Sequence, residues 1–95
     1  MLKFEWDPNK SVTNKKKHGI SFEEAQTVFF DPNARVIEDP AHSEQEERFV
    51  IMGVSQRLRI LTVCYCYRRG NKVIRIISAR RADKKEKEIY KEFLL

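Results

Sequence analysis

The stretch LRILTVCYCYRRGNKVIRIISA, residues 58–79, decides the fold. Apolar and polar side chains alternate from Leu58 to Tyr67, and Val and Ile recur from Lys72 to Ala79. Alternation and β-branched residues are both typical of strands. Arg69-Gly70-Asn71, between the two segments, contains residues that favour tight turns. The stretch therefore predicts an antiparallel hairpin.

Three further strands are predicted upstream of this hairpin. Leu2 to Trp6 alternates as a short half-buried strand does, Arg35 to Glu38 is a short strand candidate, and Arg48 to Val54 is a longer one. An acidic polar loop, Glu38 to Glu47, separates the last two and contains His42.

The first helix has a signal at each end. Asp7 is a good N-cap, and Pro8 fits the first helical position. The helix should run to about Lys17, where cations suit the helix dipole, and Gly19 should end it.

Two more helices are predicted. The capping box SFEE, from Ser21, opens the second, which Asp31-Pro32-Asn33 ends. The third runs from about Ala82 to the C-terminus, with Asp83 and Glu86 as a cap pair. Four apolar residues of this helix are expected to face inward: Ile89, Tyr90, Phe93 and Leu94.

The order of elements is strand, two helices, a mostly antiparallel sheet and a final helix. This order predicts an α+β fold with helices on one face of the sheet. At 95 residues, the chain has room for one domain, residues 1–95. The opposite face of the sheet is then left for a ligand or a partner.

Charge favours an anionic partner. The net charge is +5 and the isoelectric point is about 9.4, as expected for binding to nucleic acid or an acidic protein. The longest apolar runs are far shorter than the roughly 20 residues of a membrane-spanning helix. The N-terminal MLKFEWDPNK lacks the apolar core of a signal peptide, so we expect a cytoplasmic protein.

The sequence predicts neither a metal nor a cofactor. Cys64 and Cys66 are best interpreted as reduced core thiols, and His18 and His42 show no zinc-type spacing with them. A glycine-rich phosphate loop and a recognisable Ser-His-Asp arrangement are both missing from the sequence.

Arginines within the hairpin strands are candidates for RNA binding. Strict alternation places Arg59 and Tyr65 on one side of the first strand. In the second strand it places Arg75 opposite Ser78 and Arg80. The planar arginine fork matches phosphate oxygens, and aromatic rings stack on unpaired bases. The same arginines could instead form ordinary surface ion pairs.

RNA cleavage without a metal is the most economical chemistry for these residues. The 2′-hydroxyl attacks the adjacent phosphorus, so the enzyme has to orient the strand, move protons and stabilise developing charge. His18, Glu47 or a tyrosine could move protons. Each candidate has a structural alternative: His18 as a helix cap, Glu47-Arg48 as a cross-strand pair, and Trp6 as a core residue.

Five segments together resemble the BrnT toxins from Phe4 to about Tyr90. They are FEWDPNK with Asn14, KHGISFEEA (Lys17 to Ala25), VFFDP (Val28 to Pro32), HSEQEER (His42 to Arg48) and RIISARRA (Arg75 to Ala82). The resemblance implies a RelE-like fold and a ribonuclease that inhibits translation. It also implies a BrnA-like antitoxin with a ribbon-helix-helix region, typically two copies of each chain, and repression of the operon by the complex. Operator DNA would be bound only through the antitoxin. The basic sheet face is the expected target for an acidic antitoxin segment.

The residues and the resemblance together give the candidate site. The catalytic candidates are Arg80, Arg59, Glu47, His18 and Lys17. The RNA-binding candidates are Arg48, Tyr65, Arg68, Arg75, Ser78 and Trp6. The competing hypotheses are a non-catalytic nucleic-acid-binding or regulatory module, and a degenerate toxin that binds antitoxin without cleaving RNA.

Overall fold

The computed structural model describes residues 2–38, 47–92 and 94. The described chain forms five strands, three α-helices and one 3₁₀ helix. Their bounds are β1 Lys3–Glu5, α1 Pro8–His18, α2 Phe22–Gln26, η1 Thr27–Phe30, β2 Arg35–Glu38, β3 Phe49–Val54, β4 Ile60–Arg68, β5 Val73–Arg81 and α3 Lys84–Glu92. His42 lies outside the described residues.

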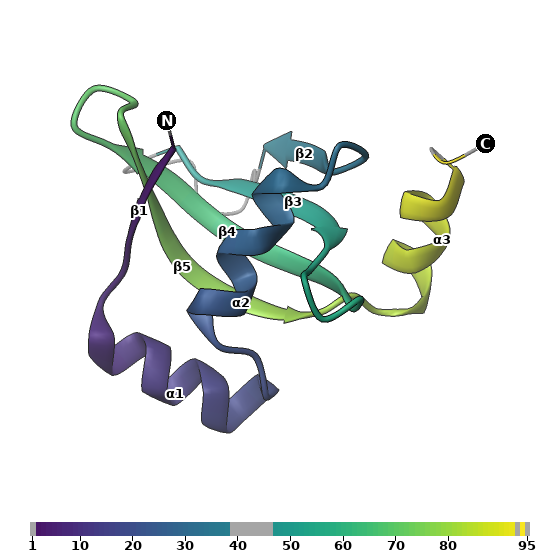
Figure 1. Ribbon diagram of the computed structural model, residues 1–95, viewed down its shortest axis with the longest axis horizontal. Coiled ribbons are helices and arrows are strands. Elements are labelled where there is room, and N and C mark those ends of the chain that lie inside the picture. Colours follow the sequence, from purple (N-terminus) through teal and green to yellow (C-terminus); the bar gives the residue numbers. More distant parts are fainter. Residues whose placement is uncertain (1, 39–46, 93, 95) are drawn as a thin grey trace.

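The strands form one sheet in the order β1-β5-β4-β3-β2. β1 pairs with β5 in parallel, and the other neighbours are antiparallel. α2 lies across one face of the sheet, α1 lies along the edge of β5, and α3 follows from the end of β5 (Figure 1). The α+β class with a mostly antiparallel sheet is confirmed.

Local sequence signals fix the ends of α1 and α2. The Asp7 side chain accepts a 2.8 Å hydrogen bond from the backbone N–H of Asn9, and Gly19 ends α1 at φ 74°. The Ser21 hydroxyl accepts from the N–H of Glu24 at 3.0 Å. The predicted second helix changes to 3₁₀ geometry at Thr27.

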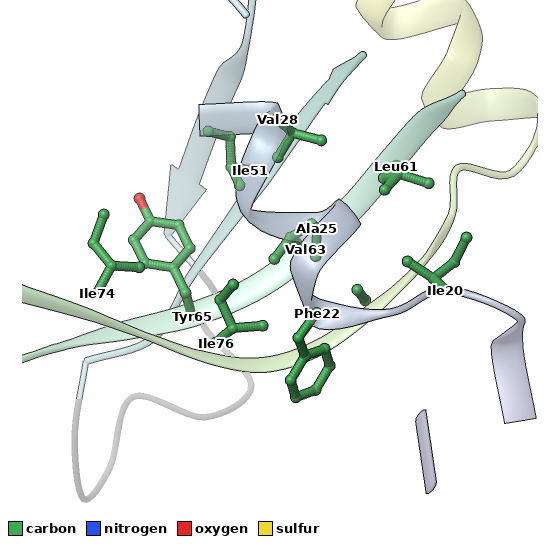
Figure 2. Packing of buried hydrophobic residues seen from close by; sticks show 11 residues of the cluster. Ile20, Phe22, Ala25, Val28, Ile51, Leu61, Val63, Tyr65, Ile74 and Ile76 are labelled. Atoms are coloured by element: carbon green, nitrogen blue, oxygen red, sulfur yellow. The ribbon is translucent and has the colours of Figure 1, made fainter. Parts of the chain in front are cut away.

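The core lies between α2, η1 and the sheet (Figure 2). Apolar residues of α2 and η1 meet alternate residues of the strands, which the period of two along each strand brings to one face. The buried cluster comprises Ile20, Phe22, Ala25, Val28, Ile51, Leu61, Val63, Tyr65, Ile74, Ile76 and Ala79. Phe4, Trp6, Phe29, Ala34 and Phe49 pack against it.

A β-bulge in β5 corrects the predicted sorting of its side chains. Cys64 pairs with Ser78, but Tyr65 pairs with Ile76, so Ile77 is an extra residue in β5. The period therefore shifts by one within the strand. Arg75 pairs with Cys66 and lies on the same face as Ser78 and Arg80, not opposite them as strict alternation predicts.

The C-terminal helix confirms one prediction and corrects another. Asp83 and Glu86 cap each other's backbone N–H groups at 2.8 and 2.9 Å, as the sequence predicts. Tyr90 is buried, but Leu94 is 51% exposed and does not face inward. Leu94 lies beyond the last residue of α3 and therefore does not continue its apolar face. The side chain of Phe93 lies outside the described part of the molecule.

Candidate nucleic-acid interface

One buried side chain fastens α1 to the edge of β5. Asn14 is 7% exposed. Its Nδ2 donates to the carbonyl of Ala79 at 2.8 Å, and its Oδ1 accepts from the N–H of Ala79 at 3.1 Å. Nδ2 also donates to the carbonyl of Ile20 at 2.9 Å. These bonds hold the helix beside the strand segment that carries Ser78 and Arg80.

The C-terminal turn of α1 brings two predicted residues to this edge. His18 follows Asn14 by four positions, and residues at i and i+4 lie on the same face of a helix. His18 is half-buried, and Lys17 is exposed. His18 and Lys17 thus lie at the end of the helix that Asn14 ties to the edge of β5.

Arg80 forms a bidentate pair with Glu86 of α3. Its Nη1 and Nη2 donate to the two Glu86 carboxylate oxygens at 2.7 and 2.9 Å. These hydrogen bonds raise the pKa of Arg80. Burial opposes the charge on Glu86, but the bonds from Arg80 and the Asp83 backbone outweigh it, and the pKa of Glu86 is lowered. Arg80 remains 43% exposed on its side chain.

Ser78 and Arg75 continue this surface along β5. Ser78 is exposed, and Arg75 is half-buried and donates to Glu5 of β1 at 2.7 Å. Both lie on the face opposite the buried Ala79 and Ile76, because their partners on β4 are Cys64 and Cys66. Arg75, Ser78 and Arg80 thus line the face that α1 and α2 do not cover.

Arg59 forms an ion pair with a buried carboxylate, that of Glu24. Its Nε donates to Glu24 at 2.9 Å, and its Nη2 contacts the other carboxylate oxygen. The Ser55 hydroxyl donates to the same carboxylate at 2.7 Å. Glu24 is 3% exposed, so the pair joins α2 to the turn between β3 and β4. This arrangement favours a structural role for Arg59.

The two aromatic candidates belong to the core. Tyr65 is 3% exposed and contacts the rings of Phe29, Phe49 and Tyr67. Burial is the main reason that the pKa of Tyr65 is raised. Its ring is therefore inaccessible for stacking on a base, contrary to the prediction. Trp6 is half-buried and packs edge-on against Phe22 at a centroid distance of 6.0 Å.

The remaining predicted residues lie at the opposite end of the central strands. Glu47 is exposed just before β3, and Arg48 is half-buried next to it. Arg68 ends β4 and is also half-buried. A pocket of about 380 Å³ opens here, lined by Glu47, Phe49, Tyr67 and Asn71.

Sequence reasoning missed the partners that orient the predicted residues. Glu86 was predicted as a helix cap, and its second role, binding Arg80, depends on where α3 begins. Asn14 stands in the middle of a helix, where an amide is unfavourable. That position is the only signal in the sequence for its bonds to Ala79.

The described residues form neither a metal-binding cluster nor a membrane-spanning helix. Residues 2–38, 47–92 and 94 contain no group of three or more His, Cys, Asp or Glu side chains arranged to hold a metal ion. None of the helices in the same ranges combines the length and apolar character needed to cross a membrane.

The chain is similar to one protein family and to a solved structure. The family model described as the ribonuclease toxin, BrnT, of type II toxin–antitoxin systems matches residues 6–86. A crystal structure of the Brucella abortus ribonuclease toxin BrnT is similar, with 27% sequence identity and a TM-score of 0.67. That similarity covers 88% of this chain and 100% of the other. No curated protein matches the chain. The family match includes Asn14, His18, Arg80 and Glu86.

Proposed function

The chain belongs to the BrnT family of ribonuclease toxins of type II toxin–antitoxin systems, and from this premise we propose that it cleaves RNA without a metal ion at the edge of β5. The observation that carries this proposal is the pair of hydrogen bonds between Asn14 and Ala79. Those bonds tie the helix that ends in Lys17 and His18 to the strand that carries Ser78 and Arg80.

The proposed chemistry uses the nucleophile that RNA carries. The 2′-oxygen forms a bond to the adjacent phosphorus, the bond to the 5′-oxygen breaks, and a 2′,3′-cyclic phosphate remains. The 2′-hydroxyl loses a proton and the leaving 5′-oxygen gains one. His18 is the proposed group for proton movement, because an imidazole carries one nitrogen that accepts and one that donates a proton.

Arg80 and Lys17 are the proposed phosphate ligands. Arginine can donate two parallel hydrogen bonds to phosphate oxygens, and positive charge stabilises the charge that develops on them. In the free protein the Arg80 fork binds Glu86. The phosphate would replace Glu86 or share the guanidinium with it. Ser78, exposed between Arg75 and Arg80, is available for a further hydrogen bond to the RNA backbone.

The test is cleavage of RNA in EDTA by the purified protein and two matched variants. Arg80→Ala removes the fork, whereas Glu86→Gln weakens the same ion pair and keeps the arginine. We expect Arg80→Ala to abolish formation of 2′,3′-cyclic ends and Glu86→Gln to retain it. Equal loss in both variants would mean that Arg80 acts only by holding α3. Intact RNA with the folded wild-type protein would contradict the proposal.

A pH profile tests His18. If His18 moves a proton, His18→Ala should lower the rate and remove one limb of the dependence of rate on pH. The exposed Lys10→Ala, on the same helix, is the control. An unchanged profile in His18→Ala would remove His18 from the chemistry.

We also propose that a BrnA-like ribbon-helix-helix antitoxin neutralises the toxin, which otherwise inhibits translation. The face that carries Arg75 and Arg80 is a suitable docking surface for an acidic antitoxin segment. The complex would contain two copies of each chain and repress its operon, binding operator DNA through the antitoxin. Growth arrest on expression, relieved by the neighbouring antitoxin gene, supports this proposal. Mass measurement of the purified complex tests the stoichiometry.

The net charge of +5 is also consistent with a second candidate, a non-catalytic nucleic-acid-binding module, and the existing ion pairs of the arginines count against a catalytic role for them. Arg59, Arg75 and Arg80 each already bind a carboxylate: Glu24, Glu5 and Glu86. Such a module would bind RNA with an affinity that falls steeply with salt, and would leave it intact.

A further inference from the structure

We propose that the pocket lined by Glu47, Phe49, Tyr67 and Asn71 binds one unpaired guanine base of the RNA substrate. The inference rests on the proposed ribonuclease function and adds base recognition to it. The pocket, about 380 Å³ in volume, falls at the lower end of the range for small-molecule sites.

Two of the described residues that line the pocket, Phe49 and Tyr67, are aromatic. Phe49 and Tyr67 have centroids 5.6 Å apart and planes inclined at 69°, so they offer a base surfaces in different orientations. Phe49 also stacks on the buried Tyr65 at 5.7 Å and 30°. Tyr67 is 39% exposed. Phe49 is thus held in place by Tyr65, and Tyr67 is exposed to solvent. Rings that are already ordered can stack on a base at a small entropic cost.

Glu47 makes the pocket selective. An ionised carboxylate only accepts hydrogen bonds, and phosphates repel it. In a protein that binds a polyanion, its favourable contact is therefore with base N–H groups. Guanine presents two adjacent donors, N1–H and the N2 amino group, which match the two oxygens of a carboxylate. The Watson–Crick edges of adenine and cytosine each carry one amino donor, and that of uracil carries one N–H. Asn71 offers an amide for the remaining polar atoms of guanine.

The surroundings suit the sugar-phosphate backbone. Arg69 and Lys72 are exposed in the turn that carries Asn71. Tyr67 is five positions along β4 from Thr62, the partner of Arg80, which is about 17 Å in an extended strand. The pocket is thus separate from the edge where cleavage is proposed. Tyr67 also points to the face of β4 opposite to Thr62 and Arg80. The pocket would therefore bind a base at some distance along the RNA from the cut, and would not take part in the reaction.

The first experiment measures binding of the four nucleoside 3′-monophosphates to the purified protein by calorimetry. We expect guanosine 3′-monophosphate to bind about tenfold more tightly than the others, within the range for bidentate base contacts. Glu47→Gln should remove most of this preference, because its amide keeps only one acceptor oxygen. Glu88→Gln, with the same change of charge on the exposed face of α3, should keep it. Tyr67→Ala should weaken all four nucleotides by about tenfold through loss of stacking.

Cleavage of short RNAs that differ only in the position of one guanine separates the two proposals. Cleavage at a fixed distance from guanine in wild type, and at no fixed distance in Glu47→Gln, supports the pocket. If RNA stays intact but the nucleotide preference is present, ribonuclease function fails and the base pocket stands. Equal binding of the four nucleotides would overturn the pocket, whatever the cleavage result. The pocket would also be overturned if Glu47→Gln slowed the cleavage of every RNA equally and kept the preference for guanosine 3′-monophosphate.

Discussion

Asn14 satisfies with one side chain both backbone groups of Ala79 that point away from β4. β1 pairs with β5 only from Val73 to Arg75. Along the rest of β5, at Ala79, the amide of Asn14 therefore takes the place of a neighbouring strand. The same interaction closes an edge that could pair with another chain and positions α1.

Asn14→Ala should destabilise the fold by about 2 to 4 kcal/mol, because it leaves the buried N–H and carbonyl of Ala79 and the carbonyl of Ile20 without this partner. Urea unfolding monitored by circular dichroism measures the change. Thr13→Ala, exposed on the same helix, should stay within about 0.5 kcal/mol of wild type. A similar small effect for Asn14→Ala would show that α1 is held by its apolar contacts alone.

The two ion pairs of Arg59 and Arg75 should differ in their contribution to stability. Arg59→Gln leaves the buried Glu24 carboxylate with fewer partners, and we expect a loss of about 2 to 3 kcal/mol. Arg75→Gln breaks a pair whose two side chains are each about one-third exposed, and should cost less than about 1 kcal/mol. Chemical denaturation of both variants tests the ranking. The reverse order would contradict the structural role assigned to Arg59.

Acid should weaken the contact between η1 and α3. Burial raises the pKa of Asp31, but hydrogen bonds from Tyr90 and from the backbone of Val54 and Asn33 outweigh it and lower the pKa below its ordinary 3.8. A lowered pKa in the folded protein gives stability that is present above pH 3.8 and is lost as the pH falls through the folded value. We expect the wild-type free energy of unfolding to fall more between pH 5 and pH 3 than that of Asp31→Asn.

Tyr90→Phe tests the hydrogen bond between Tyr90 and Asp31 by removing its donor. The Tyr90 hydroxyl donates to Asp31 at 2.5 Å, and burial together with this bond raises the pKa of Tyr90 to about 12. The variant should show a weaker acid dependence than wild type, because Asp31 loses one of its donors. Urea titrations at several pH values measure both variants. Parallel pH curves for all three proteins would count against this explanation.

Gly53 should not tolerate a larger residue. A Cβ there would lie 3.1 Å from an Asp31 carboxylate oxygen, 3.2 Å from the Ala34 Cβ and 3.2 Å from the Val28 carbonyl. Gly53→Ala should therefore lower stability by about 1 to 3 kcal/mol, as overpacking does. Gly70→Ala is a useful contrast: no atom lies within 4 Å of the added Cβ, and its cost comes from the positive φ of 63°. Thermal unfolding of wild type, Gly53→Ala and Gly70→Ala compares the stability of the two variants.

The sequence predicts most elements because their signals are local. Asp7-Pro8, Gly19 and the SFEE box fix helix ends through contacts within four residues, and the strand alternation needs no tertiary information. The parallel pairing of β1 with β5 was not predicted. It joins segments about 70 residues apart, and three residues, Lys3–Glu5, contain too little pattern to choose a partner.

The candidate site was predicted less completely, for the same reason. Residue type made Arg59, Arg75 and Arg80 candidates either for phosphate binding or for ion pairs. The carboxylates that they pair with, Glu24, Glu5 and Glu86, depend on how distant elements pack. For Tyr65 the sequence predicted a ring available to RNA, and the structure shows a buried one. Its phenol suggested an exposed stacking ring, whereas the strand register places it between Phe29 and Phe49.

The extra residue in β5 makes the length of this strand as important as its composition. Substitution of Ile77 would leave the faces of β5 unchanged, and its loss would give a regular ladder with the same faces. Insertion of one further residue beside it, in contrast, would exchange the faces of one half of the strand. In one outcome Arg75 would turn toward the core while Ile74 and Ile76 turned toward solvent. We therefore expect natural variants of this hairpin to avoid single-residue insertions in β5, and to tolerate replacement or loss of the bulge residue.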